Sequence, residues 1–329
     1  MKKLTIKEIA ELTGVSTATV SKVLNNTGRY SEETRKKILD VVQEYDYRPN
    51  AVAKSLRTRR SKTIGVIVPD ITNEFFAQIV LAIEKYCGPK GYSVFICNTD
   101  ENGEKELQYI KELELKGVDG LIHLIGSDEL FNVETNLPVV CIDRKPMAHN
   151  AAFITSDNFQ GGYLAASELI EKGCKKILLI RDYRVGHPTL ERQKGFKAAL
   201  KEKKIPFNEE EQVLNVEVGI EQGKKAVQEL IKNGNFDFDG VFATTDWLAF
   251  GAKLALEENG IKIPEEVKII GFDNINLAKY SSVSSIHQDK EAMGQKAAEN
   301  LINRIELNIH TNDVIKLPVT LVSRSSTSV

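Results

Sequence analysis

The spacing of hydrophobic positions changes near residue 62. Before that point, apolar residues recur every three or four positions, which is typical of short amphipathic helices. After it, short continuous apolar runs alternate with helical stretches. A strand in a parallel sheet reads as such a run because helices cover both of its faces. The pattern predicts an all-α amino-terminal segment followed by a parallel α/β body.

Three helices are predicted in the first segment, over residues 6–13, 17–24 and 32–45. Thr5 and Glu8 have the spacing of a capping box, in which each side chain accepts from the other's backbone N–H. The residues expected on the inner faces of the three helices are Ile6, Ile9, Ala10 and Leu12, then Val20, Val23 and Leu24, then Ile38, Leu39, Val41 and Val42.

The turn between the first two helices contains Gly14, and Ser16 and Ser31 are the expected N-caps of the second and third helices. Two short helices joined by such a turn, followed by a third, form the helix-turn-helix pattern. The second helix of that motif enters the major groove of DNA. A three-helix bundle that binds nothing is the alternative, but the outward face of the second helix is small and polar: Thr17, Ala18, Ser21 and Lys22.

The distribution of charge agrees with a DNA-binding segment. The formal net charge is only −2, but residues 1–62 carry 14 Lys and Arg against 7 Asp and Glu. The remaining residues are acidic overall. A basic segment attached to an acidic body indicates a polyanionic partner for the segment.

Hydropathy excludes other classes of protein. The apolar content of 42% is too high for a disordered chain. The longest stretch without Asp, Glu, Lys or Arg is residues 146–156, whereas a membrane span needs about 20 residues. Charges at Lys7 and Glu8 interrupt any signal-peptide core. We therefore expect a cytoplasmic protein with no membrane partner.

A second basic segment comes after the three helices. Pro49 disfavours helix before it and Asn50 can cap a new helix, so residues 51–57 are expected to form two helical turns. A helix this short is not stable alone in water. Because the segment is basic, DNA phosphates are the expected agent that orders it.

These residues resemble a known family. The strings T-I-K-E-I-A-E-L-T-G-V-S-T-A-T-V-S-K-V-L-N and Y-R-P-N-A-V-A-K-S-L-R resemble the head and hinge of LacI-type (lactose-repressor family) transcription regulators, and the resemblance continues along the chain. It implies a homodimer on a near-palindromic operator, with Leu56 as a wedge in the minor groove. The positions assigned to DNA are Thr5, Ser16, Thr17, Ala18, Ser21, Lys22, Arg29, Asn50, Leu56 and Arg57.

The expected domains are a helix-turn-helix head at 1–49, a hinge helix and linker at 50–62, and an effector-binding and dimerisation body at 63–329. The body's strand and helix count suits two doubly wound parallel-sheet subdomains. The chain is expected to cross between them near 157–161, 288–290 and 319–323.

Ligands of such sheets bind at the carboxyl ends of the strands, where several loops are chemically distinctive. Two adjacent aromatics at the start of a helix, Phe75 and Phe76, are expected to place one ring in the crevice, although both can instead pack in the core. Asp246 can be a plain helix N-cap, and Arg192 can be a solvated surface residue. The effector-binding candidates are Phe75, Phe76, Asp143, Arg144, Asp157, Arg192, Thr245 and Asp273.

The resemblance implies that the body is similar to periplasmic sugar-binding proteins. Arg192 matches an R-x-x-G pattern and Asp273 a G-[FY]-D-[ND] pattern, and in the family both commonly hold ligand hydroxyls or ring groups. Thr245, where many members have Asn, and Val218, where many have an aromatic, are departures that put the shape of the effector in doubt. Gly186 replaces an arginine of purine-responsive members. We therefore expect a sugar, such as the pentose ribose.

Catalysis is not indicated. The sequence contains no dinucleotide, P-loop, G-x-S-x-G or H-E-x-x-H motif, and its four cysteines have no zinc-ligand spacing. We assign no metal, no cofactor and no enzymatic activity. The expected function is a ligand-responsive regulator, most simply a repressor. The alternatives are an exported sugar-binding protein, an α/β enzyme with a DNA-binding domain, and a catabolite-control regulator whose corepressor is a phosphorylated carrier protein.

Overall fold

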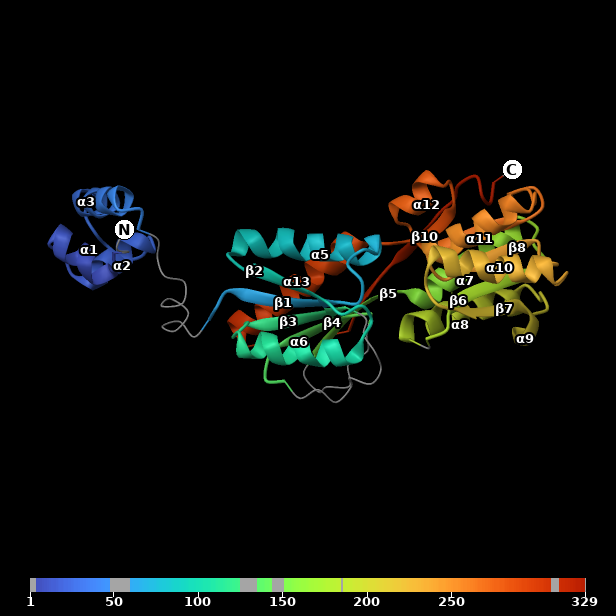
Figure 1. Ribbon diagram of the computed structural model, residues 1–329, viewed down its shortest axis with the longest axis horizontal. Coiled ribbons are helices and arrows are strands. Elements are labelled where there is room, and N and C mark those ends of the chain that lie inside the picture. Colours follow the sequence, from blue (N-terminus) through green and yellow to red (C-terminus); the bar gives the residue numbers. More distant parts are fainter. Residues whose placement is uncertain are drawn as a thin grey trace. The chain divides into compact units, whose positions relative to one another are not determined.

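The computed structural model describes residues 4–47, 60–124, 135–143, 151–184, 186–308 and 314–328. The chain forms two compact units, a head of residues 1–61 and a body of residues 62–329, and each is described on its own (Figure 1).

The head contains the three expected helices. They are α1 (Ile6–Thr13), α2 (Thr17–Leu24) and α3 (Glu32–Glu44). The capping box is confirmed, because the Thr5 N–H donates to Glu8 Oε2 at 2.7 Å and the Glu8 N–H donates to Thr5 Oγ1 at 3.3 Å. Ser16 and Ser31 cap α2 and α3. The core of the head is Ile9, Ala10, Val20, Val23 and Ile38.

Two leucines of the head lie on a different face from the one expected. Leu12 and Leu39 were expected inside, but they are 52% and 39% exposed. The buried stripe of α1 continues from Ile9 to Thr13, whose hydroxyl donates to the Ile9 carbonyl at 2.7 Å. A threonine can occupy a helical core position when its hydroxyl bonds to the preceding turn. The spacing of three and four residues therefore ends on Thr13 and leaves Leu12 outside.

The body contains two six-stranded sheets, as the alternating pattern predicted. The strand orders are β11-β5-β4-β3-β1-β2 and β12-β10-β9-β8-β6-β7, and the strand pairs of the described residues are parallel except β10 with β12. The strands of the first sheet are β1 (Thr63–Val68), β2 (Ser93–Asn98), β3 (Gly120–Leu124), β4 (Val139–Ile142), β5 (Ala151–Ser156) and β11 (Val314–Leu317). Those of the second are β6 (Ile177–Asp182), β7 (Val213–Val216), β8 (Gly240–Ala243), β9 (Lys268–Asp273), β10 (Ser284–Gln288) and β12 (Val319–Val322).

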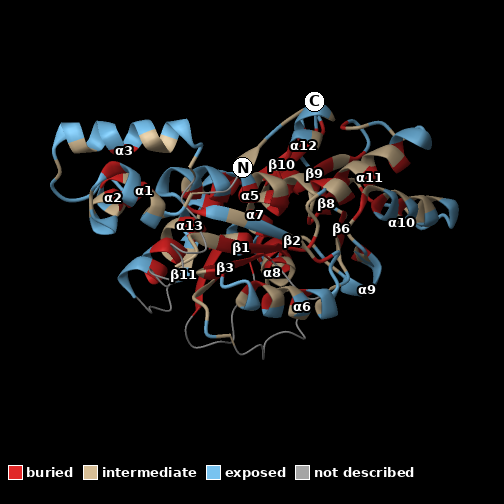
Figure 2. Ribbon diagram, turned by 60° about the vertical axis from the view of Figure 1, so that its left-hand side comes forward, coloured by how far each residue is buried: buried red, intermediate tan, exposed pale blue. Residues whose placement is uncertain are grey.

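Helices cover both faces of each sheet. Those of the first half are α5 (Glu74–Cys87), the 3₁₀ turn η1 (Gly88–Lys90), α6 (Gly103–Leu115) and α13 (Lys290–Leu307). Those of the second half are α7 (Asn158–Glu171), α8 (His187–Glu202), α9 (Glu209–Gln212), α10 (Ile220–Lys232), α11 (Asp246–Glu258) and α12 (Asn276–Tyr280). Figure 2 shows that burial is concentrated on the strands and on the helix faces that contact them.

Strand β1 illustrates why the sequence pattern was continuous. Ile64, Val66 and Val68 belong to the core shared with α5 and α13, whereas Ile67 belongs to the core shared with α6. Successive side chains of a strand point to opposite faces, so a strand covered on both sides needs apolar residues at every position.

Three chain crossings join the two halves. The chain leaves β5 for α7 at Asp157, leaves β10 for α13 at Asp289, and leaves β11 for β12 at Pro318. The third crossing lies just before the range 319–323 expected from the sequence. The crossings bring the carboxyl ends of strands from both sheets toward one region of the body.

Candidate functional site

The head presents the outward face of α2. Thr17, Ala18 and Lys22 are exposed, and Ser21 is half-buried. Thr5 and Ser16 are also exposed, but their side chains cap helices, with Ser16 Oγ accepting from the Thr19 N–H at 3.1 Å. The face therefore carries small side chains and one cation, which can approach base edges and phosphates closely.

A turn after α2 positions Arg29. Gly28 has a φ of 78°, a conformation that glycine adopts without strain, and an added Cβ would lie 3.2 Å from Lys22 Cδ. Arg29 itself is exposed. The remaining DNA-contact candidates, Asn50, Leu56 and Arg57, lie outside the described residues.

The body contains a buried cluster of charged side chains at the carboxyl ends of its strands. Asp143 follows β4, Asp273 ends β9, Asp246 follows β8, and Arg192 lies on α8. Each is at most 6% exposed. Buried charges are stable only with partners, and perturbed groups gathered in one place mark a candidate functional site.

Arg192 is the centre of this cluster. Its Nε donates to Asn158 Oδ1 at 2.8 Å, and its Nη1 donates to the Thr244 carbonyl at 2.6 Å. Nη1 also lies 3.7 Å from Asp273 Oδ1, and the guanidinium carbon lies 3.7 Å from the centroid of the Phe272 ring. The surface alternative for Arg192 is therefore wrong, because the side chain is buried and held in one orientation.

Two glycines allow the helix contact that places Arg192. An added Cβ at Gly162 of α7 would lie 1.9 Å from the Arg192 carbonyl oxygen, and one at Gly195 of α8 would lie 1.8 Å from the Phe159 carbonyl oxygen. Only glycine permits backbones to approach this closely. The glycine of the R-x-x-G pattern thus has a packing role that brings Arg192 to Asn158.

Asp143 supplies a carboxylate from the first half. Its Oδ1 accepts from the Thr155 hydroxyl at 2.6 Å, and its Oδ2 has no hydrogen-bond partner among the described residues. Burial raises the pKa of Asp143, while the Thr155 hydrogen bond and the charge of Arg192 oppose the rise. Arg192 and Asp143 come from different halves, so the cluster spans the junction between them.

Asp273 supplies the carboxylate of the second half. Its Oδ1 accepts from Gln288 Nε2 at 2.7 Å, and its carbonyl accepts from Lys290 Nζ at 2.5 Å. Burial raises the pKa of Asp273 to about 6, although the charges of Arg192 and Lys290 act in the opposite direction. Asp273 has a φ of 106° and Asp143 one of 56°, so both candidate carboxylates sit on backbone that non-glycine residues rarely adopt.

Thr245, rather than Asp246, caps helix α11. Thr245 is the N-cap of α11, and its hydroxyl accepts from the Leu248 N–H at 3.3 Å. Asp246 is the first helical residue, and its carboxylate accepts from the Ile275 N–H at 2.8 Å and from the Ser285 hydroxyl at 2.6 Å. Burial and the nearby charge of Asp273 raise the pKa of Asp246. The N-cap alternative for Asp246 is therefore wrong.

Phe75 and Phe76 are both buried, at 4% and 8% exposure, and their rings meet edge to face with centroids 5.3 Å apart. Both pack into the first core rather than leaving one ring open in the crevice, so that expectation was wrong. The same core includes Ile275 and the partly buried Trp247 of the second half. The aromatic pair thus lies against the junction, on the side of the first half.

The other two candidates lie apart from the cluster or are not described. Asp157 caps α7, accepting from the Gln160 N–H at 3.1 Å, and its carboxylate pairs with Lys316 at 3.2 Å. Arg144 lies outside the described residues. The neighbour of Asp157, Asn158, is the residue that reaches Arg192.

Contacts on two sides of the junction hold the halves together. Glu74 of α5 accepts from the backbone and the side chain of Asn276 in α12. Arg184 of the second half pairs with Glu101 of the first while also bonding Asp182. Polar contacts from both halves therefore meet at the junction in addition to the buried cluster.

Sequence reasoning missed Asn158, Gln288 and Lys290. All three are at most 5% exposed, although their residue types are usually found at the surface. Asn158 comes directly after the candidate carboxylate of Asp157. Gln288 ends β10 and Lys290 begins α13, at a crossing that was expected without these side chains being assigned to the site. Their positions beside Arg192 and Asp273 depend on tertiary contacts.

Metal and membrane sites are not indicated in the part of the chain that the structure describes. That part contains no group of three or more His, Cys, Asp or Glu that could hold a metal ion. It also contains no helix long and apolar enough to cross a bilayer. The four cysteines are free thiols, three of them buried.

The fold and the two sites define a class: a helix-turn-helix DNA-binding unit attached to a two-lobed body of the periplasmic-binding type. Residues 5–50 match the family model of bacterial regulatory proteins, lacI family, and residues 61–325 match that of periplasmic binding proteins and sugar binding domain of LacI family. The chain belongs to the LacI family, and it is a DNA-binding repressor of that family.

Relatives and solved structures agree with this assignment. The chain is 36% identical to the HTH-type transcriptional repressor PurR of Vibrio atlanticus (strain LGP32), covering 98% of each. It is similar to the lac repressor dimer bound to operator and the anti-inducer ONPF, with a TM-score of 0.88 and 25% identity over 99% of each chain. It is also similar to a LacI family regulator from Enterococcus faecium with bound ribose, with a TM-score of 0.73 and 33% identity, covering 80% of this chain and 98% of that one. A periplasmic binding protein/LacI transcriptional regulator from Alkaliphilus metalliredigens QYMF complexed with D-xylulofuranose is similar as well, with a TM-score of 0.72 and 34% identity. The match covers 82% of this chain and 100% of that one.

Proposed function

We propose that this repressor is controlled by a small hydroxyl-rich effector, most simply a pentose such as ribose, which binds in the buried cluster around Arg192. The observation that carries the proposal is a set of polar atoms inside the body without hydrogen-bond partners among the described residues. They include Asp143 Oδ2, Gln288 Oε1 and the Thr244 hydroxyl. A buried unsatisfied polar atom is costly, so a group of them indicates a missing partner.

The chemistry of these atoms suits a sugar. A carboxylate oxygen and an amide oxygen only accept, so each needs a donor, and a sugar hydroxyl is a donor that also accepts from a cation such as Arg192. The similar structures that contain ribose and D-xylulofuranose support the same class of ligand.

A purine base is the second candidate, because the PurR relatives are more similar overall than the sugar complexes. Arg192 and Asp273 can also hold the edge of a planar base. Against it, Gly186 has no side chain to reach a ligand. The phosphoprotein alternative has less support, because no contact described in the body requires a macromolecular corepressor.

Calorimetry with D-ribose, D-xylulose and hypoxanthine separates the candidates. We expect a pentose to bind wild-type protein and to lose binding in Arg192→Met, while the exposed Lys194→Met binds normally. Lys194 lies two residues away on the same helix and pairs with Glu191 at 2.7 Å. Binding of hypoxanthine but of neither pentose would replace the sugar by a purine. Binding that is unchanged by Arg192→Met would place the effector elsewhere.

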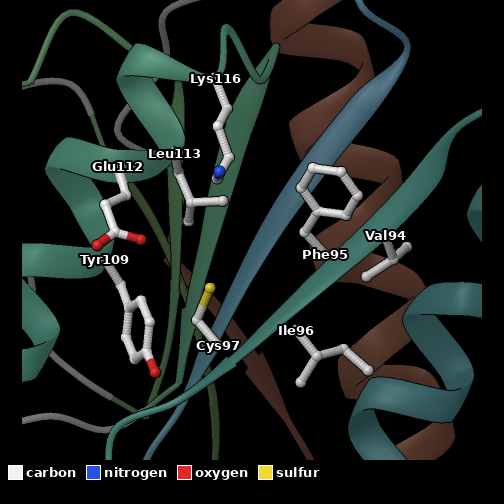
Figure 3. Close-up of a pocket in the computed structure, with 8 residues that line it drawn as sticks. All are labelled: Val94, Phe95, Ile96, Cys97, Tyr109, Glu112, Leu113 and Lys116. Atoms are coloured by element: carbon white, nitrogen blue, oxygen red, sulfur yellow. The ribbon is translucent and has the colours of Figure 1, made fainter.

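We also propose that the repressor acts as a homodimer on a near-palindromic operator. The lac repressor structure with a TM-score of 0.88 is a dimer bound to operator. In the body, β2 is an edge strand with Phe95 and Ile96 about half exposed, beside a cavity of about 300 Å³ that α6 also lines (Figure 3). A second copy of the chain is the occupant we propose for this surface, since an apolar edge strand left open is prone to pairing.

The head and hinge positions assigned from the sequence complete the proposal. Thr17, Ala18 and Lys22 would face the major groove, and Leu56 would kink the minor groove between paired hinge segments. Effector binding would fix the relative orientation of the two body halves and thereby the separation of the hinges. Such coupling is reciprocal and typically amounts to about 1–3 kcal/mol.

A further inference from the structure

The backbone of Lys62 is held where the chain enters the body from the DNA-binding segment. Its N–H donates to Asp119 Oδ2 at 2.9 Å, and its carbonyl accepts from the Ser93 N–H at 2.8 Å. Its φ is 54°, which turns the chain sharply before β1 begins at Thr63. Two hydrogen bonds from different segments therefore fix this residue beside the amino-terminal ends of β2 and β3.

The side chain of Lys62 adds a second attachment. Its Nζ donates to Glu306 Oε1 at 2.7 Å and lies 4.1 Å from the centroid of the Tyr92 ring. The Tyr92 hydroxyl donates to the same Glu306 oxygen at 3.4 Å, and Tyr92 is 4% exposed. Lys62, Tyr92 and Glu306 therefore form one contact group, here called the entry clamp.

Helix α13 joins the entry clamp to the effector cluster. Its first residue, Lys290, donates from Nζ to the carbonyls of Asp273 at 2.5 Å and Gln288 at 3.0 Å, and its penultimate residue is Glu306. At 1.5 Å per residue, the 18 residues of α13 span about 27 Å. An added Cβ at Gly294 would lie 2.5 Å from the Ile79 carbonyl, so the helix is packed tightly against α5.

This packing makes α13 part of the first half. Met293 and Leu301 are fully buried in the core that α13 shares with α5 and the first sheet. Lys290 is therefore one point at which the first half contacts the Asp273 loop of the second half. Because α13 packs as part of the first half, a rigid-body movement of that half would carry Lys290 and Glu306 together.

We propose that Lys62 is a positioning residue: through Glu306 and Tyr92 it makes the attachment of the DNA-binding segment stiff, so that effector-driven movement of the first half is passed to that segment. A movement of the body is transmitted to the DNA-binding segment only if the connection at Lys62 is rigid. A flexible connection would allow the body to move while the segment stays in place. The inference rests on the proposed function for the effector response, but the stiffness of the clamp is measurable without any effector.

Four variants test the clamp. Lys62→Met keeps an unbranched apolar stem over Tyr92 and removes the ammonium, and Glu306→Gln removes the charge of the partner. Lys62→Arg keeps a cation and is the conservative variant. The matched control is Lys296→Met, because Lys296 forms a similarly exposed pair with Glu299 at 2.8 Å on the same helix.

Hydrogen exchange of the full-length protein without ligand measures stiffness. The amides of Lys62 and Ser93, which the clamp orders, should exchange about tenfold faster in Lys62→Met and Glu306→Gln, because local opening costs less free energy there. They should be unchanged in Lys62→Arg and Lys296→Met. Unchanged exchange in both disrupting variants would overturn the proposal.

Coupling is measured as the change in operator affinity that D-ribose causes. The operator fragment for this measurement is obtained by selection with wild-type protein. Lys62→Met and Glu306→Gln should bind D-ribose with wild-type affinity by calorimetry, while the ratio of operator affinities with and without D-ribose falls toward one. A wild-type ratio in either variant would overturn the proposal. If wild-type protein shows no response to D-ribose, the sugar assignment fails and hydrogen exchange alone decides the role of the clamp.

Discussion

Arg192 Nε donates to Asn158 Oδ1 at 2.8 Å, which ties helix α8 to the start of α7 inside the body. The bond orients the guanidinium, with Asp143 on one side of the junction and Asp273 on the other. A preformed cation between two carboxylates can receive a polar ligand with little rearrangement, and pre-organisation of this kind raises affinity.

Replacing Arg192 by Met should abolish effector binding and also destabilise the body. The substitution leaves the buried carboxylates of Asp143 and Asp273 without their shared cation, and removing one partner of a buried ionic contact typically costs about 3–5 kcal/mol. Urea unfolding of the two proteins measures the loss. An unfolding free energy equal to that of wild type would show that Arg192 is not a structural partner of these acids.

Replacing Gly195 by Ala should weaken both stability and effector binding. The new Cβ would fall 1.8 Å from the Phe159 carbonyl oxygen, so α7 and α8 must separate and the Asn158–Arg192 bond must lengthen. Overpacking of this kind typically costs about 1–3 kcal/mol.

The matched control for that change is Gly186→Ala, also at α8, where an added Cβ would meet nothing nearer than Pro188 Cδ at 3.9 Å. Thermal unfolding should show a clear drop for Gly195→Ala and little change for Gly186→Ala. Equal effects of the two substitutions would mean that the close crossing of the helices is not what the glycine provides.

Effector affinity should rise as the pH increases from 5 to 7.5. Burial raises the pKa of Asp273 to about 6, so in the free protein this carboxyl is largely protonated at pH 5. A ligand hydroxyl that donates to Asp273 favours its ionised form, and each unit of pKa corresponds to about tenfold in affinity. The pKa of Asp143, whose Oδ2 is proposed to accept from the ligand, is raised as well, which acts in the same direction.

The same raised pKa makes the free protein lose stability as the pH rises from about 4 to about 6. The folded state binds a proton more tightly than the unfolded state, so stability falls through this interval.

Calorimetry at several pH values, with Asp273→Asn as the control, tests the prediction that effector affinity rises with pH. Wild-type affinity that is the same at pH 5 and pH 7.5 would contradict it.

Replacing Leu56 by Ala should weaken operator binding far more than non-specific DNA binding. A wedge between base steps acts only on a kinked duplex, whereas phosphate contacts act on any sequence. Fluorescence anisotropy with an operator fragment and a scrambled fragment at the same salt concentration measures both. Equal losses on the two fragments would argue against a minor-groove role for Leu56.

The sequence predicted the features that depend on local chemistry. The capping box of Thr5 and Glu8, the N-caps at Ser16 and Ser31, and the buried strand at β1 depend on neighbouring residues and appear where expected. The family and the two-sheet fold are confirmed as well.

Features set by tertiary contacts were not predictable in the same way. Gln288 and Lys290 have ordinary surface residue types and join the cluster only because β10 pairs with β9. Helix α13 packs through Gly294, Ala297 and Ala298, which give a weak hydrophobic signal. Phe75 and Phe76 both became buried because residues of the second half complete their core, which local periodicity does not reveal.

The central claim is that one ligand, bound around Arg192, controls operator binding. The most direct test is to measure the affinity of D-ribose for the free repressor and for the repressor bound to its operator. Linkage requires the two affinities to differ by the factor by which D-ribose changes operator affinity, typically about 5–150-fold. We predict such a difference in wild-type protein. Binding of D-ribose with the same affinity in both states would contradict the account.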